Sequence, residues 1–475
     1  MATYGTGSLL SLDAVGKQDT YLTSNTSCDS AFNYQNVRHS NFSVTNRVYT
    51  VSNPGDGSPN WPFDKEIIIT MKPQGMGDLL SNMYFKCDLP EIPGNNFTKA
   101  TYTDQIGRAL IDTITFRVDG VVVETLENDW GIIHDEVFLT SEEKSANKFK
   151  VNGGSDYGLL PADYIVDAGA NRSGPAVGPV SVYVSLNFFF SRSYASSDTN
   201  NTLMLDSFFK PYFPVCAISN QEIQIVIKFN PVTFFTKLQD DGSTISLDKF
   251  ELVNEEIILS DEERHFLQHH KQELMTEVVK RNAITPFDFT DTTSVKCYLI
   301  PTIPVKAMFW FFRDVRYDNK DTDDNFDNYL QRYNYSGSPV NDYVVDNEKL
   351  YPIMSDAEIF INSIPMLGII QADAQDNIHT SNYYKYMQPM QHELSSPIRN
   401  IYTYSFALKP KAATPTGVLN FSTVDSTKSF INASLLLNSD INPDRNRQFN
   451  MHVYFLGYQM LVFENGFMSL KYATF

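Results

Sequence analysis

The chain has 475 residues, which at about 150 residues per domain corresponds to three domains or to two large β-rich ones. Hydrophobic residues make up 42% and charged residues 20% of the sequence, which excludes a disordered chain or a coiled coil. Acidic residues outnumber basic ones by 56 to 37, a net charge of −19. This charge argues against direct binding to a nucleic-acid backbone, which requires basic patches.

No apolar segment of the chain predicts a membrane span. The longest candidate, residues 299–312, is interrupted by Pro301, Pro304 and Lys306, whereas a span needs about 20 apolar residues. The N-terminus lacks the basic and apolar regions of a signal peptide, so the cysteines are predicted to be reduced, packed thiols. These cysteines are Cys28, Cys87, Cys216 and Cys297.

Residues 1–40 are polar and rich in Ser, Thr and Asn, and they are predicted to form an N-terminal arm. The rest of the chain contains many short segments in which apolar and polar residues alternate, and aromatic residues reach 13%. Both features favour β-strands, which expose alternate side chains to opposite faces. The predicted strands are 66–71, 114–118, 121–123, 182–188, 223–229, 307–312, 357–361, 402–408 and 451–463.

A two-residue hairpin is predicted at Asp119 and Gly120. The alternating segment 114–118 precedes these residues and three valines follow them. A type I′ turn needs a positive φ at both central positions, which Asp and Gly tolerate.

One segment near the middle of the chain predicts a helix. Ser260 and Glu263 have the spacing of a capping box, in which each side chain bonds a free backbone N–H of the first turn. Apolar residues follow at helical spacing, namely Phe266, Leu267, Leu274 and Val278. We therefore expect a helical linker over residues 259–285.

The segments on either side of this linker follow a similar order, with little identity between them. The first half runs 83–89, 110–123, 130–139, 182–190 and 222–229, and the second runs 308–314, 357–366, 383–394, 401–408 and 450–461. A period near 200 residues indicates a duplicated domain. The prediction is an all-β fold of two consecutive eight-stranded antiparallel jelly rolls, over residues 41–258 and 286–475.

The known catalytic and nucleotide-binding motifs are missing from the sequence. No P-loop, HExxH or GxSxG motif occurs, and residues 5–7 (GTG) are too short for a dinucleotide site. His265 and His269 have a spacing that can bind a metal, with Glu262 nearby, but zinc sites need three or four ligands, so a polar helix face is preferred. The sequence predicts no catalytic, cofactor-binding or metal-binding residues.

Residues 318–328 contain five aspartates, and clustered carboxylates can bind calcium. An EF-hand starting at Asp321 would have Phe326 where glycine is needed and Arg332 where the closing glutamate belongs. A solvated acidic loop is the preferred interpretation, and whether this loop binds an ion stays open.

The aromatic runs 188–190 and 309–312 also have two interpretations. They could stack on bases or sugars. Continuous apolar runs are more typical of strands buried on both faces or of an interface. The net charge of −19 favours core or interface.

Several segments occur in the order of one known family, among them residues 257–266 (IILSDEERHF) and 404–410 (YSFALKP). They resemble the double jelly-roll major capsid proteins of the nucleocytoplasmic large DNA viruses. Residues 257–266 resemble the end of the family's first barrel, and residues 404–410 resemble its most recognisable second-barrel motif. The chain departs from the family at Leu419, often a cysteine, and at Thr423, usually an arginine. Further matching segments are 18–23, 38–42, 111–123 with Asp129 and Trp130, 182–190, 415–417 and 420–422.

The resemblance implies a structural protein without enzymatic activity or cofactors. Three chains would form a pseudo-hexagonal homotrimer, and such capsomers would tile the outer icosahedral capsid around the DNA, with neighbouring capsomers and minor capsid and penton proteins as partners. The arm, residues 1–40, would lie on the inner side near an internal membrane, and assembly would occur in the host cytoplasm. Outward loops are expected at 140–179, 191–213 and 314–348. The alternatives are a minor capsid protein of the same fold or a carbohydrate-binding β-sandwich protein.

Overall fold

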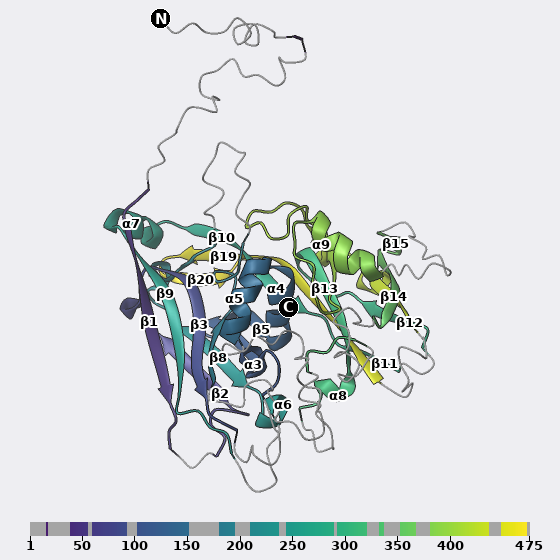
Figure 1. Ribbon diagram of the computed structural model, residues 1–475. Coiled ribbons are helices and arrows are strands. Elements are labelled where there is room, and N and C mark those ends of the chain that lie inside the picture. Colours follow the sequence, from purple (N-terminus) through teal and green to yellow (C-terminus); the bar gives the residue numbers. More distant parts are fainter. Residues whose placement is uncertain are drawn as a thin grey trace, which may run out of the picture. The chain divides into compact units, whose positions relative to one another are not determined.

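Antiparallel strands dominate the computed structural model, and those of the described residues form four sheets (Figure 1). The structure describes residues 16–17, 39–55, 59–92, 102–151, 180–194, 210–236, 244–288, 292–320, 332–336, 352–366, 381–436 and 448–472. The four sheets pair into two successive sandwiches, the first before residue 260 and the second from residue 272.

The first sandwich has two sheets. One has the order β1-β9-β3-β6, with β7 also paired to β3, and consists of β1 (Phe42–Ser52), β9 (Lys249–Leu259), β3 (Leu79–Leu89), β6 (Val180–Ser185) and β7 (Phe213–Pro214). The other has the order β2-β8-β4-β5 and consists of β2 (Glu66–Met71), β8 (Ile223–Phe229), β4 (Ile111–Val118) and β5 (Val121–Glu127).

The second sandwich repeats this plan. One sheet has the order β10-β19-β13-β16 and consists of β10 (Gln272–Arg281), β19 (Gln448–Glu464), β13 (Pro304–Asp314) and β16 (Tyr402–Ser405), with β11 (Thr285–Asp288), β17 (Leu419–Asn420) and β20 (Phe467–Leu470) at its sides. The other has the order β12-β18-β14-β15 and consists of β12 (Ser294–Tyr298), β18 (Phe430–Leu435), β14 (Met354–Ile361) and β15 (Ile364–Pro365).

Both sandwiches have the jelly-roll topology. When the eight principal described strands of either one are numbered along the chain, one sheet reads 1-8-3-6 and the other 2-7-4-5. These interleaved orders are those of two Greek keys wound together. The predicted all-β fold of two eight-stranded antiparallel jelly rolls is confirmed.

Helices occupy the connections between these strands. The connection between the fifth and sixth principal strands contains helix in both sandwiches, α4 and α5 in the first and η9 and α9 in the second. Of these, α4 lies at segment 130–139, and η9 and α9 lie at segment 383–394, which the sequence repeat aligned with it. The bounds are η3 (Pro73–Gly75), α3 (Ile106–Ala109), α4 (Asn128–Val137), α5 (Ser141–Val151), η6 (Val215–Ile218), α6 (Val232–Phe235), α7 (Asp261–His269), α8 (Val315–Asp318), η9 (Tyr383–Met387), α9 (Gln388–Gln391), η10 (Phe421–Thr423) and η11 (Ser426–Lys428).

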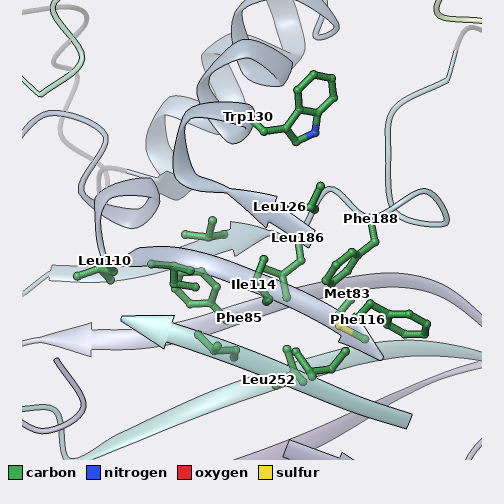
Figure 2. Packing of buried hydrophobic residues seen from close by; sticks show 14 of the residues in the cluster. Met83, Phe85, Leu110, Ile114, Phe116, Leu126, Trp130, Leu186, Phe188 and Leu252 are labelled. Atoms are coloured by element: carbon green, nitrogen blue, oxygen red, sulfur yellow. The ribbon is translucent and has the colours of Figure 1, made fainter. Parts of the chain in front are cut away.

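The core of the first sandwich lies between its two sheets. Figure 2 shows Phe85 and Leu252, which come from one sheet, and Ile114 and Phe116, which come from the other. Phe116 is fully buried and lies edge-on to Phe213, with ring centroids 5.0 Å apart. Alternation along each strand places these side chains inward, as the sequence pattern predicts.

Strand β13 is buried on both faces. Met308, Trp310 and Phe312 belong to the core of the second sandwich. Phe309 and Phe311, between them, belong to the hydrophobic cluster of the first. The continuous apolar run 307–312 therefore results from one sheet that separates two cores, which confirms its interpretation as core.

The predicted hairpin is confirmed. Asp119 has φ 49° and Gly120 has φ 80°, the positive values that a type I′ turn requires. Val118 pairs with Val121 across this turn.

The predicted helical linker over residues 259–285 is wrong for most of its length. Helix α7 ends at His269, and Gln272–Arg281 is strand β10, so the second sandwich begins at residue 272 and not at 286. A separation of four residues places Leu274 and Val278 on one face of a helix and equally on one face of a strand, so this spacing did not distinguish the two. Ser260 is the N-cap, but its side chain makes no capping hydrogen bond.

Parts of the predicted arm and loops lie outside the described residues. This holds for almost all of the arm 1–40, for Cys28, for residues 152–179 and 195–209, and for residues 321–331 and 337–350.

Candidate functional site: the joint between the two sandwiches

Aromatic side chains fill the contact between the two sandwiches. Phe309 from β13 lies 5.9 Å from the ring of Trp130 and 5.6 Å from that of Phe138, centroid to centroid. Phe213, at the start of β7, lies 5.7 Å from Phe463 of β19. The joint is therefore packed like a core and not like a loose domain contact.

Arg313, at the end of β13, binds carboxylates of both sandwiches. Its guanidinium donates to the two carboxylate oxygens of Asp129 on α4 at 2.7 and 2.9 Å, and its Nε donates to Asp318 on α8 at 2.5 Å. Burial by itself would raise the pKa of Asp129, but the Arg313 guanidinium overrides burial and holds this pKa below its usual value. Arg313 thus ties helix α4 of the first sandwich to a strand of the second.

A second buried cluster surrounds Glu124 of β5. One of its oxygens accepts from the guanidinium of Arg192 and from the backbone N–H of Val279 on β10 (3.2 Å). Glu277 of β10 binds Arg192 at 3.3 Å and also accepts from the ammonium of Lys306 on β13. Burial raises the pKa of Glu124 even though Arg192 opposes this shift.

A third cluster centres on Arg399, just before β16. Its guanidinium donates to Glu136 of α4 at 2.5 Å and to Asp104 at 2.7 Å. The other Glu136 oxygen accepts the backbone N–H of Ile398 at 2.9 Å. Arg399 and both of these carboxylates are buried or nearly so, so the connection before β16 is fixed to the first sandwich.

His452 of β19 lies beside the Arg313 cluster and is fully buried. Its Nδ1 faces a guanidinium nitrogen of Arg281 at 3.2 Å, and its Nε2 faces Asp318 at 3.0 Å. Since arginine can only donate, Nδ1 accepts and Nε2–H donates, which defines a neutral ring. Burial is the main cause that lowers the pKa of His452.

The outer sheet of the second sandwich presents an aromatic row to solvent. Tyr298, Phe430 and Phe360 lie opposite one another on β12, β18 and β14. Their rings are 6.0 and 4.8 Å apart, and the Lys296 ammonium lies 3.7 Å from the Phe430 centroid. Tyr298 is 44% exposed, and Ile364 on β15 is 66% exposed. We call Tyr298, Phe360 and Phe430 the aromatic row.

The predicted candidate metal ligands do not form a site in the described residues. His265 and His269 stack on each other on the exposed α7, with centroids 4.0 Å apart, and Nδ1 of His269 contacts the His265 carbonyl. Over the same residues no group of three or more His, Cys, Asp or Glu could hold a metal ion, and no helix is long and apolar enough to cross a membrane.

The acidic segment 318–328 is described only as far as Lys320. Asp318 is a partner of Arg313 and His452 and not part of a solvated loop. Arg332 is buried and donates to four backbone carbonyls, among them that of Phe234 at 2.9 Å. The remaining aspartates lie outside the described residues.

The other predicted candidates are core residues. Phe188, Phe189 and Phe190 follow β6 and are fully buried, so base or sugar stacking is excluded for them. Cys87 and Cys216 are free thiols, as predicted, and burial raises the pKa of Cys216 to about 12.

Sequence analysis missed the charged residues of the joint. It gave no role to Arg313 or Arg399 and did not predict that Asp129 is buried in an ion pair, although Arg313 directly follows a run of buried aromatics. A charge next to such a run was the available signal, because a buried charge needs a partner. The partner of Arg313 is 184 residues away in the sequence, and no local pattern could identify it.

Two family models match successive parts of the chain. Residues 30–257 match the major capsid protein N-terminus, and residues 263–469 match the large eukaryotic DNA virus major capsid protein. The boundary between them falls at the start of α7, between the two sandwiches. The chain belongs to the major capsid proteins of large DNA viruses. The resemblance predicted from its motifs is confirmed.

Curated major capsid proteins are similar over their whole length. That of Phaeocystis pouchetii virus is 23% identical, and that of Pyramimonas orientalis virus is 24% identical. Each alignment covers 98% of this chain and 100% of the relative.

Solved capsid structures share the fold of this major capsid protein. The quasi-atomic model of the PBCV-1 virus capsid has a TM-score of 0.67 at 17% identity and covers 94% of this chain and 100% of that one. The Faustovirus major capsid protein has a TM-score of 0.61 at 10% identity, with 96% of both chains covered. The two sandwiches therefore have the fold of solved capsid proteins.

Proposed function

We propose that this major capsid protein forms homotrimeric, pseudo-hexagonal capsomers that tile the outer icosahedral capsid. The observation that carries the proposal is the repeated strand order of the two sandwiches. Three chains with two similar barrels each would place six barrels around a closed three-fold axis, and a six-sided block tiles a lattice.

The aromatic row supports a role in association. Tyr298 on β12 and Ile364 on β15 expose apolar surface at the two edges of one sheet. Aromatic residues are enriched in interfaces, and obligate interfaces are large and apolar. A surface of this composition is suited to contact with another subunit or capsomer.

Membership of this family extends the proposal to the partner proteins, to the position of the arm in the virion and to the site of assembly. The partners would be neighbouring capsomers and the minor capsid and penton proteins, with the arm 1–40 on the inner side near a membrane. Assembly would occur in the host cytoplasm, and the protein would have no enzymatic activity and no direct contact with the genome.

The oligomeric state tests this proposal. Mass photometry of the purified full chain should give three times the monomer mass, and negative-stain images should show a three-lobed block with a hexagonal outline. Phe430→Ser should weaken trimers or the contacts between them, whereas Val122→Ser, at an exposed position of β5 in the first sandwich, serves as the control. A chain that stays monomeric at all concentrations would contradict the proposal.

A minor capsid protein of the same fold is the second candidate, since both share the described architecture. Quantitative mass spectrometry of purified particles separates the two. A major protein dominates the particle, whereas a minor one has a low copy number.

A further inference from the structure

Lys210, Asn82 and Glu255 form a connected group on the outer face of the first sandwich. The Lys210 ammonium donates to the side-chain oxygen of Asn82 at 2.6 Å. The amide nitrogen of the same Asn82 donates to Glu255 at 2.8 Å, and Ser81 donates to that Glu255 oxygen as well. An amine, a carboxamide and a carboxylate therefore follow one another in hydrogen-bond contact.

The geometry of these three groups suits acyl transfer to an amine. The amine faces the carbonyl side of the amide, and the carboxylate faces its nitrogen, which is the leaving group. A carboxylate in contact with the leaving nitrogen can deliver a proton to it, as a general acid–base catalyst does. All three residues are partly buried, which limits competition by water.

Lys210 is also a more reactive amine than an ordinary surface lysine. Burial lowers its pKa to about 8, although Glu255 opposes the shift. Near neutral pH a measurable fraction of Lys210 is therefore the neutral nucleophile, as in enzymes that use a desolvated lysine.

We propose that Lys210 and Asn82 join in an intramolecular isopeptide bond, with Glu255 as the proton carrier. The neutral amine of Lys210 attacks Cγ of Asn82 and forms the new C–N bond. Glu255 takes a proton from the attacking nitrogen and returns it to Nδ2. The Cγ–Nδ2 bond then breaks and one ammonia leaves, with no oxidant or reductant needed.

The chain contains a second lysine–asparagine pair that serves as an internal comparison. Lys385 donates to Asn400 at 2.8 Å, and burial lowers its pKa to about 8 as well. The carboxylate whose charge opposes this lowering of the Lys385 pKa is Glu136. One of its oxygens accepts from Arg399 and the other from the N–H of Ile398. Glu136 is thus not available to carry a proton, and we expect this pair to stay unlinked.

The bond would have a mechanical consequence. It would connect residues 128 positions apart and attach the chain just before β7 to the middle strand β3. Cross-links that close long loops restrict the unfolded chain and so stabilise the folded one. A capsid subunit that must withstand the environment outside a cell would benefit from this restriction.

Peptide mapping of the full-length protein tests the proposal. The protein is incubated at a pH of about 8, near the lowered pKa of Lys210, then digested and analysed by tandem mass spectrometry. We expect a branched peptide in which Lys210 is joined to Asn82, one ammonia lighter than the sum of its parts. Loss of ammonia without a branch would indicate a cyclic imide at Asn82 and would overturn the proposal.

Two variants test the roles of the residues. Lys210→Arg keeps the charge and the hydrogen bond but should abolish the branched peptide. Glu255→Gln keeps an acceptor for Asn82 and should reduce branching at least tenfold. A branched peptide that persists in Glu255→Gln, or one that joins Lys385 to Asn400 instead, would overturn the assignment.

Discussion

At the scale of single residues, the joint depends on buried charges that neutralise one another. Arg313 and Arg399 each bind two carboxylates in the contact between the sandwiches. A buried ion pair adds little to stability compared with a well-packed apolar contact, but removal of one partner leaves an uncompensated buried charge. The arginines are therefore expected to specify how the sandwiches fit together more than to strengthen the contact.

Removal of Arg313 should be costly. Arg313→Ala leaves Asp129 and Asp318 without their cation, and we expect the free energy of unfolding to fall by about 3–5 kcal/mol. Lys271→Ala is the control, since Lys271 and its partner Glu464 are both half exposed and their pair should be worth only about 0–1 kcal/mol. Urea unfolding of both variants measures this difference, and equal effects would contradict the assigned role of Arg313.

The buried His452 makes stability depend on pH. Its pKa is lowered by burial in the folded chain, whereas in the unfolded chain it is about 6.5, so the unfolded state binds the proton more readily. Stability is then fully present above about pH 6.5 and falls as the pH decreases, by up to about 1.4 kcal/mol per pH unit for each such histidine. The pKa of His134 is also lowered by burial, so it adds to the same decline.

Thermal unfolding of the wild type and of His452→Gln at pH 7.5 and 5.5 would measure this dependence. The variant should lose part of the pH dependence but not all of it, because the pKa of His134 is also lowered by burial. The Asp318 carboxyl, whose pKa is held low by Arg313 despite burial, should contribute only at much lower pH. An unchanged pH dependence in the variant would show that His452 does not titrate with unfolding.

At the scale of elements, strand β13 pairs with β19 through an irregular register. The register shifts between Val305 and Ala307, and Val305 lies opposite Gly457. Lys306 is the extra residue of this bulge. It is also the residue whose buried ammonium donates to Glu277. The carbonyl of Pro304 comes so close to Gly457 that a Cβ there would lie 2.3 Å from the oxygen.

Gly457→Ala should therefore disturb the β13–β19 pair. The clashing atom belongs to the backbone and cannot rotate away, so we expect a loss of about 1–3 kcal/mol in the free energy of unfolding. Gly75→Ala is the control, because a Cβ at Gly75 meets no atom within 4 Å. Equal midpoints of urea unfolding for the two variants would contradict the close approach.

At the scale of the whole molecule, the two sandwiches share a sheet face instead of standing apart. The strands β10, β19 and β13 have their own core on one side and the cluster of the first sandwich on the other. The described strands belong to one contact-defined unit over Phe42–Ala195 and Lys210–Phe475. A subunit built in this way presents two barrels in one fixed relation, which a regular capsid lattice requires.

Local pattern was sufficient for much of this architecture. A short β-type segment identified β2 and alternation identified β8, both with correct bounds. The Asp119-Gly120 pair identified the hairpin, and the order of segments identified the duplication and the family. These properties depend on residues close together in the chain, where side-chain period and turn chemistry act directly. The spacing of Leu274 and Val278 fits both the helical and the strand period, so the pattern there was ambiguous. Pairing with β19 makes this segment the strand β10.

The joint was decided only by the tertiary structure. Asp129 meets Arg313 across 184 positions, and Asn82 meets Lys210 across 128. A carboxylate or an amine carries the same local signal on a surface as in a buried cluster, and its neighbours are determined by how the sheets pack. Sequence pattern therefore predicted the two barrels, whereas the charges that join them, and the group that could cross-link one of them, became visible only in the folded chain.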